Sequence, residues 1–174
     1  MRVFFGLGLD AETQSEIDGW LSKCLPPFFR PVVQYNFHVT LAFLGNVTPM
    51  QLKSVVELGE RVQASTFTLR LSQMGYWPRQ EIVYLAPPHV PCELVHLAEE
   101  AKQLARRSGL RVERRAYRPH LTLARRCKVA PPAPLMQPDF ELSVEEFRLF
   151  ESVRRPSGVV YKTLETFYLN RIRL

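Results

Sequence analysis

The spacing of apolar residues along the chain predicts three helices. Apolar residues recur at helical spacing over residues 11–24, over residues 49–62 and from about residue 91 to residue 108. Asp10 before the first segment and Thr48-Pro49 before the second are typical helix starts, because Asp and Thr cap the first turn and Pro fits the first helical position. Gly109, after the third segment, is a typical helix stop.

Between these helices lie apolar segments rich in the β-branched and aromatic residues that favour strands. We expect strands over residues 3–9, 37–45, 67–74, 82–85, 120–126, 142–152 and 159–174. Prolines at 26, 27 and 31, and four more between 131 and 138, force irregular connections. Because strands and helices are interleaved throughout, we expect residues 1–174 to form one two-lobed domain.

An approximate repeat divides the chain into two halves. The first half contains VFFGLGL, a helix and HVTLAFLG, and the second contains IVYLAPP, a helix and HLTLARR. Each copy is therefore a strand, a helix and a strand that begins with a histidine. A pseudo-twofold arrangement of the two copies would bring His38 and His120 face to face across a cleft.

Both of these strands open with the motif His-x-Thr-Leu. Side chains alternate between the faces of a strand, so His38 and Thr40 should share one face, as should His120 and Thr122. One such motif is common in half-buried strands. At average composition a given position matches by chance about once in 10⁴, so two copies at equivalent positions of a repeat indicate a functional site.

Two imidazoles with neighbouring hydroxyls suit phosphodiester cleavage. One histidine can accept a proton from the attacking oxygen while the other donates one to the leaving oxygen, and residue chemistry alone allows either direction. Thr40 and Thr122 can hydrogen-bond the non-bridging phosphate oxygens. No carboxylates cluster near either motif, so we expect no metal and no other cofactor. We expect His89 and His96, which lack a paired motif, to be structural or solvated.

The charge of the chain fits a phosphate-bearing partner. There are 23 Lys and Arg against 17 Asp and Glu, a net charge of +6, and arginines outnumber lysines. The arginine-rich stretch 106–118 either steers RNA towards the site or is a solvated helix end favoured by the helix dipole. Aromatic residues that could stack a terminal base are Phe5, Tyr35, Trp77 and Tyr117.

Cysteine spacing and the first residues of the chain bear on its compartment. The three cysteines show no CxxC spacing, so neither a disulfide framework nor a zinc site is indicated. The opening residues MRVFFGLGLDAE predict no signal peptide or membrane span. We therefore expect a cytoplasmic protein, and a monomer.

The two motifs and their flanks resemble the two-histidine (2H) phosphoesterase superfamily, above all its bacterial and archaeal RNA 2',3'-cyclic phosphodiesterases, once called 2'-5' RNA ligases. The resemblance covers nearly the whole chain and rests on VFFGLGLD, HVTLAFLG and YRPHLTLAR. It implies a bilobal, pseudo-twofold α+β fold in which two antiparallel sheets line a central cleft and the helices lie outside. It also implies opening of an RNA 2',3'-cyclic phosphate to a 2'-phosphomonoester, and reversible, ATP-independent 2'-5' joining of RNA ends.

The resemblance also implies roles for particular residues. His38 would be the acid that protonates the departing 3' oxygen, His120 the base that activates water, and Arg125 a further phosphate contact. Strand alternation instead places Arg126 on the face of His120, so Arg125 can share that face only if a bulge or bend intervenes.

Two other functions remain open from the sequence. The first is a module that binds RNA ends through its arginines without turning them over. The second is a phosphodiesterase for a small cyclic nucleotide metabolite.

Overall fold

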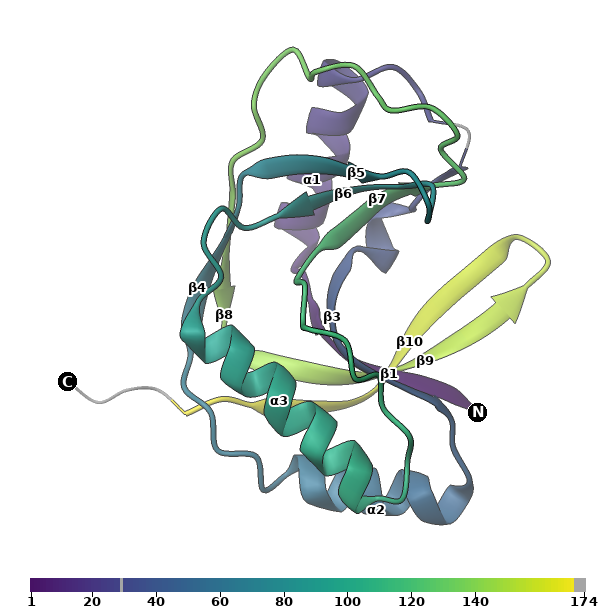
Figure 1. Cartoon of the computed structure of the whole chain (residues 1–174), viewed down its shortest axis with the longest axis vertical. Helices are drawn as coiled ribbons and strands as arrows, with labels where there is room; N and C mark the ends of the chain where they lie inside the picture. The colour runs from purple at the N-terminus through teal and green to yellow at the C-terminus, as the bar shows by residue number, and fades with distance from the viewer. Residues whose placement is uncertain (29, 171–174) are drawn as a thin grey trace.

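The computed structural model describes residues 1–28 and 30–170, and this part of the chain forms an α+β fold (Figure 1). The helices are α1 (Ala11–Cys24), α2 (Pro49–Gly59) and α3 (Cys92–Arg107), with a short 3₁₀ turn at Gln34–Asn36. The strands are β1 (Arg2–Gly8), β2 (Arg30–Pro31), β3 (His38–Asn46), β4 (Phe67–Leu71), β5 (Gln73–Trp77), β6 (Ile82–Ala86), β7 (Leu121–Arg125), β8 (Phe140–Val144), β9 (Glu146–Arg155) and β10 (Gly158–Tyr168). The expected last strand runs on to residue 174, of which 171–174 lie outside the described residues.

All three expected helices are confirmed, together with their end signals. The Asp10 side chain accepts a hydrogen bond from the backbone of Thr13 at 2.7 Å and begins α1. Thr48 and Gln51 form a capping box at the start of α2. After α3 the chain turns at Gly109, whose φ of +74° is a conformation that favours glycine.

The main sheet is antiparallel and contains eight strands. Seven follow the order β10-β9-β1-β3-β7-β6-β5, and β2 pairs with β7. Two sheets were expected, one for each half of the repeat. The structure joins them at one position, where Val39 of β3 lies opposite Leu121 of β7, and both residues are fully buried. β3, which begins with His38, and β7, which begins directly after His120, therefore start side by side at the junction of the halves.

Two of the expected strands are each divided in two. The 67–74 segment becomes β4 and β5, and the 142–152 segment becomes parts of β8 and β9. β4 and β8 pair with each other in a separate two-stranded sheet, whose alternate side chains are buried. The alternation of apolar residues shifts by one position at each break, from Leu71 to Met74 and from Val144 to Phe147, and the expectation of single strands overlooked this shift.

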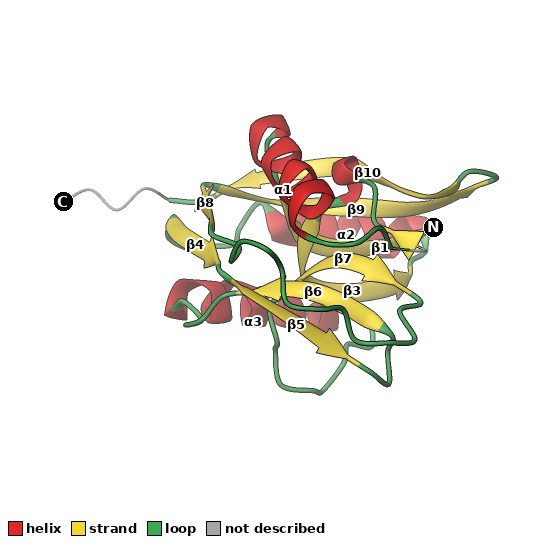
Figure 2. Ribbon diagram, turned by 90° about the horizontal axis from the view of Figure 1, so that it is seen from above, coloured by secondary structure: helices red, strands yellow, loops and turns green. Residues whose placement is uncertain are grey.

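The helices lie outside the sheet halves. Figure 1 shows α1 in the half that holds β5, β6 and β7, and α2 and α3 in the other half, where α3 contacts β3. The hairpin of β9 and β10 extends away from the body of the fold, as Figures 1 and 2 both show. Among the described residues, no helix is long and apolar enough to cross a membrane.

Candidate active site

The first motif holds the ring of His38 by both nitrogens. Nδ1 lies 2.7 Å from the backbone carbonyl of Asn36, and Nε2 lies 3.0 Å from Oγ1 of Thr40. A carbonyl can only accept, so Nδ1 carries the proton of the neutral ring and Nε2 is left as an acceptor. His38 and Thr40 therefore point to one face of β3, as strand alternation predicts.

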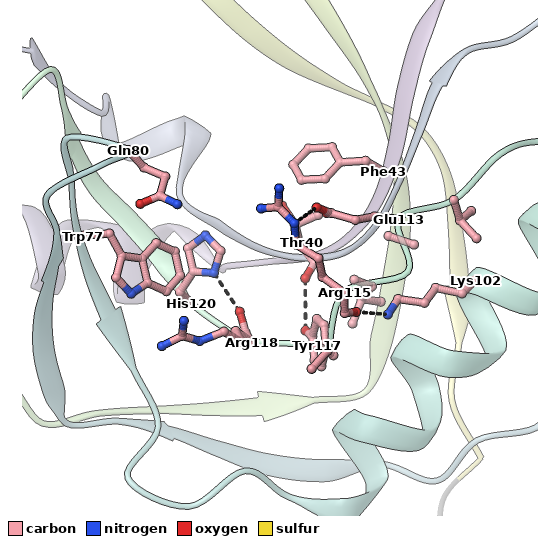
Figure 3. Close-up of a pocket in the computed structure, with 14 residues that line it drawn as sticks. Thr40, Phe43, Trp77, Gln80, Lys102, Glu113, Arg115, Tyr117, Arg118 and His120 are labelled. Carbon is pink, nitrogen blue, oxygen red and sulfur yellow. Dashed lines mark hydrogen bonds and ion pairs between the residues drawn. The ribbon is translucent and has the colours of Figure 1, made fainter.

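The second motif repeats the backbone contact of the first. Nδ1 of His120 lies 2.8 Å from the backbone carbonyl of Arg118, again two residues before the histidine (Figure 3). By the same reasoning Nδ1 donates, and Nε2 is the atom free to exchange a proton with a substrate. The two imidazoles are thus fixed in the same tautomer by equivalent backbone groups.

A β-bulge follows the threonine of each motif. In β3, Thr40 and Ala42 pair with consecutive residues of β1, so Leu41 has no partner there. In β7, Thr122 and Ala124 pair with consecutive residues of β6, so Leu123 is likewise extra. One extra residue shifts the alternation of side chains by one position. Beyond the bulge, the odd offset therefore returns Arg125 to the face of His120 and Thr122.

Arg126 is placed differently from Arg125. It follows the end of β7 with a φ of +56° and lines one cavity beside His38, whereas Arg125 lines two. Arg125 is also close enough to lower the pKa of both His38 and His120. The expectation that simple alternation favours Arg126 is therefore wrong, because it took the strand to be regular.

One cavity, which we call the His120 cavity, lies beside the second histidine (Figure 3). It has a volume of about 360 Å³, and its wall includes Thr40 of the first motif. The rest of the wall includes Glu113, which pairs with Arg115 at 3.0 Å, and the aromatic and cationic side chains of Phe43, Trp77, Lys102, Arg115, Tyr117 and Arg118. The hydroxyl of Tyr117 donates to the Thr40 carbonyl at 3.0 Å, which ties the loop before β7 to the strand of the first motif.

Two further cavities, of about 610 and 400 Å³, lie beside His38. Arg125 and Tyr161 line both, and Thr122 of the second motif lines the smaller one. The other cationic side chains on their walls are Arg2, Arg30, Arg126 and Arg154. Each threonine thus lines a cavity beside the histidine of the opposite motif, so the two halves interlock at the site.

The surroundings of the histidines favour their neutral forms. Burial lowers the pKa of His38 to about 4, with further lowering by Arg125 and His120 and an opposing effect of the bond to the Asn36 carbonyl. Burial also lowers the pKa of His120, again helped by Arg125 and opposed by a backbone hydrogen bond. An anion bound between the two rings would raise the pKa of both histidines, because it favours their charged forms.

The remaining candidates fall into three groups. Phe5 is fully buried in the core, whereas Tyr35 lines a His38 cavity and Trp77 and Tyr117 line the His120 cavity. His89 and His96 are exposed, the first in a loop and the second on α3. Of the arginine-rich stretch, Arg115 and Arg118 line the His120 cavity, while Arg106 pairs with Glu99 at 3.1 Å.

Phe43 is one of the site residues, with Tyr161 and Asn36, that the sequence did not single out. It lies on β3 five residues after His38, is 55% exposed and lines both the His120 cavity and the larger His38 cavity. Its equivalence to Arg125 in the repeat was the available signal. Among the described residues, no group of three or more His, Cys, Asp or Glu is placed to hold a metal ion.

Comparison with known protein families bears on the repeat. The family model for LigT-like phosphoesterases matches the chain twice, over residues 7–84 and over residues 85–161. One unit of this family therefore corresponds to each half, and the boundary falls within β6, the first strand of the second copy.

Relatives with assigned activities match over almost the whole chain. The chain is 36% identical over 171 residues to the RNA 2',3'-cyclic phosphodiesterase of Escherichia coli, covering 98% of this chain and 97% of that protein. It is 31% identical over 180 residues to the RNA 2',3'-cyclic phosphodiesterase of Thermus thermophilus, covering 97% and 90%.

Solved structures match equally well. The structure of E. coli LigT complexed with 3'-AMP has a TM-score of 0.88 at 34% identity and covers 97% of each chain. The structure of E. coli LigT complexed with NADP+ has a TM-score of 0.87 at 35% identity and covers 97% of this chain and 96% of that one. The chain therefore belongs to the LigT-like phosphoesterases, the two-histidine family, and is a hydrolase of the RNA 2',3'-cyclic phosphodiesterase class.

Proposed function

We propose that the enzyme opens a terminal RNA 2',3'-cyclic phosphate to a 2'-phosphomonoester by metal-independent acid–base catalysis with His38 and His120. The observation that carries this proposal is the pair of imidazoles, both anchored through Nδ1 to a backbone carbonyl and both affected by Arg125. Such a pair can move one proton on and another off the reacting oxygens without a metal.

In the proposed reaction the cyclic phosphate lies between the two rings. Nε2 of His120 accepts a proton from water as its oxygen attacks phosphorus, and the bond from phosphorus to the 3' oxygen breaks. Nε2 of His38 donates a proton to that departing oxygen. Arg125, with the hydroxyls of Thr40 and Thr122, binds the non-bridging oxygens, where negative charge must be stabilised in the transition state.

This direction of proton transfer requires a protonated His38, whereas burial keeps its pKa near 4 in the free enzyme. The bound phosphate supplies the negative charge that raises this pKa, because an anion beside an imidazole favours its charged form. Substrate binding therefore has to accompany protonation of His38. His120 must remain neutral to act as the base, and this direction of transfer is taken from the family resemblance, since burial lowers the pKa of both histidines.

The proposed substrate is the end of an RNA chain. Arginines on the walls of both His38 cavities, including Arg2, Arg30 and Arg154, suit the phosphates of a polynucleotide. Relatives named as RNA 2',3'-cyclic phosphodiesterases and a LigT structure with 3'-AMP also support a nucleotide ligand. If an RNA 5'-hydroxyl replaced water, the same groups would join ends through a 2'-5' linkage without ATP.

We further propose that residues 1–174 act as one monomeric, two-lobed domain with pseudo-twofold symmetry, and that the cleft between the lobes holds the substrate. Three features support this proposal: two matches to one family unit, equivalent bulges in β3 and β7, and a single paired position between those strands.

The experiment compares an oligoribonucleotide ending in a 2',3'-cyclic phosphate with the corresponding mononucleoside cyclic phosphate, both in excess EDTA. Two results together support the proposal. The product formed in EDTA is a 2'-phosphate, identified by ³¹P NMR, and kcat/KM for RNA falls steeply as the salt concentration rises. Loss of activity on chelation overturns the metal-free mechanism. A preference for the mononucleoside with no salt dependence indicates a small cyclic nucleotide as the substrate instead.

A further inference from the structure

Asn36 makes contacts with three neighbouring groups although its side chain is almost completely buried, at 7% exposure. Its backbone carbonyl accepts from Nδ1 of His38 at 2.7 Å. Its side-chain amide donates to the carbonyl of Val159 at 2.7 Å, and its side-chain oxygen accepts from the backbone N–H of Tyr161 at 3.1 Å. One residue thus bonds both the imidazole and strand β10.

The bonded part of β10 forms a wall of the site. Tyr161 packs edge-on against His38, with ring centroids 4.8 Å apart and planes at 82°. Val159 and Tyr161 line both His38 cavities. This segment belongs to the hairpin that extends away from the body of the fold (Figure 1), so its contacts with the 3₁₀ turn help to fix where the hairpin lies.

The second motif has a similar arrangement. Arg118, also two residues before its histidine, offers its carbonyl to Nδ1 of His120, and its guanidinium lies 5.1 Å from the ring centroid of Trp77. Trp77 packs against His120 with centroids 4.6 Å apart and planes at 70°. In both halves, the backbone carbonyl of the residue two before the histidine holds the imidazole. The side chain of the same residue contacts the strand whose aromatic ring, Tyr161 or Trp77, packs against that imidazole.

We propose that Asn36 is a positioning residue that couples the β9–β10 hairpin to His38, so that the seating of the hairpin sets the orientation and hydration of the acid imidazole. This inference rests on the proposed role of His38 in the reaction. A buried amide that loses its partners incurs a desolvation cost, so Asn36 strongly disfavours any other position of Val159 and Tyr161. Asn36 need not touch the substrate.

The coupling has a consequence that can be measured without turnover. If the hairpin loosens, more water reaches His38, which is half-buried and already lines two cavities, and part of the burial that lowers its pKa is relieved. That pKa should therefore rise from about 4 towards its ordinary value of 6.5. Among the other polar or charged groups that face His38, Arg125 on β7, His120, Thr40 and Arg2 on β1 stay in place. Tyr161 on β10 and Arg154 on β9 move with the hairpin, and the departure of the arginine cation also favours a higher His38 pKa.

The test uses Asn36→Ala and Asn36→Asp, with Asn170→Ala as the control because Asn170 is an exposed asparagine bonded to Gln63. Imidazole NMR follows the titration and tautomer of His38 in each folded variant, and kinetics on a cyclic phosphate give kcat and KM. For Asn36→Ala we expect kcat to fall roughly 10- to 100-fold, KM to change much less, and the His38 pKa to rise. Asn170→Ala should match the wild type in all three measurements.

Asn36→Asp, whose side chain is nearly the same size as that of asparagine, provides a second variant in case Asn36→Ala does not fold. It keeps an acceptor for the Tyr161 N–H but sets a carboxylate oxygen against the Val159 carbonyl, which repels it, so the hairpin should loosen and kcat should fall here too. The His38 pKa should rise from both the loosening and the added carboxylate. Folded Asn36 variants with wild-type kcat and unchanged His38 titration would overturn the inference. Inactivity of the wild type, or full activity of His38→Ala in the same assay, would instead reject the proposed function. In that case the NMR titration of His38 would still show whether Asn36 couples the hairpin to the imidazole.

Discussion

Phe43 and Arg125 occupy equivalent positions in the two halves of the site, each five residues after a motif histidine and each beyond a bulge. The halves therefore match in their histidines and threonines but differ here, where one presents an aromatic ring and the other a guanidinium. Both side chains line the larger His38 cavity. The two halves of the site are thus chemically different, which suits an asymmetric ligand.

Arg125 should matter more than Arg126 for turnover. Arg125→Gln removes the cation that acts on both histidines, and we expect kcat/KM for a nucleoside 2',3'-cyclic phosphate to fall roughly 10²- to 10³-fold. Arg126→Gln alters only one cavity wall, so it should lower kcat/KM by less than about tenfold. Steady-state kinetics of the two variants check this order. Equal losses of kcat/KM would contradict the conclusion that the bulge places Arg125, and not Arg126, on the face of His120.

Phe43 should contribute to binding rather than to the chemical step. Its exposed ring lies between two cavities, where a nucleobase could stack on it. Base–aromatic stacking contributes about 1–3 kcal/mol, so Phe43→Ala should raise KM by roughly tenfold or more and leave kcat within a few-fold. Phe43→Tyr keeps the ring and serves as the control. A lower kcat at unchanged KM would show that Phe43 acts otherwise.

Replacing the bridging 3' oxygen of the substrate by sulfur tests the direction of proton transfer. A thiolate leaves without being protonated, so a general acid is no longer needed. We expect His38→Ala to recover most of its lost kcat on this substrate, whereas His120→Ala stays impaired because it still lacks the base. If the rescued variant is His120→Ala, the roles of the two histidines are exchanged.

The low pKa of His38 should make the fold acid-sensitive. In the folded chain the pKa is about 4 against an ordinary 6.5, so between these values the unfolded chain binds a proton that the folded chain does not. The contribution of His38 to stability is therefore complete above about pH 6.5 and is lost as the pH falls towards 4.

Urea midpoints measured at pH 7 and pH 5 test this effect. We expect the midpoint to fall less between these values in His38→Gln than in the wild type. The exposed-histidine variant His89→Gln should keep the wild-type dependence. Identical pH dependence in His38→Gln and the wild type would show that His38 is not buried in its neutral form.

The sequence was informative where residue type alone decides the local structure. Asp10, the Thr48 capping box and Gly109 mark helix ends through their own hydrogen bonds or backbone conformation, and all three are found as predicted. The shared face of His38 and Thr40 follows from strand periodicity over two residues. Over that distance no irregularity intervenes.

Sequence reasoning did less well where position depends on strand pairing. The face of Arg125 is set by the extra Leu123 opposite β6, and leucine is equally at home in regular strands, so nothing local marks a bulge. The role of Asn36 depends on Val159 and Tyr161, which lie 123 and 125 residues away along the chain. Phe43 was not among the stacking candidates, because its exposure depends on the cavities that neighbouring strands create.

The most direct test of the central claim is turnover of a 2',3'-cyclic phosphate, in EDTA, by His38→Ala, His120→Ala and the double variant, each shown to be folded by circular dichroism. If the histidines act together on one proton-transfer path, each single variant should lose roughly 10³-fold or more in kcat, and the double variant little more than either. Near-wild-type turnover by either single variant would contradict the two-histidine mechanism.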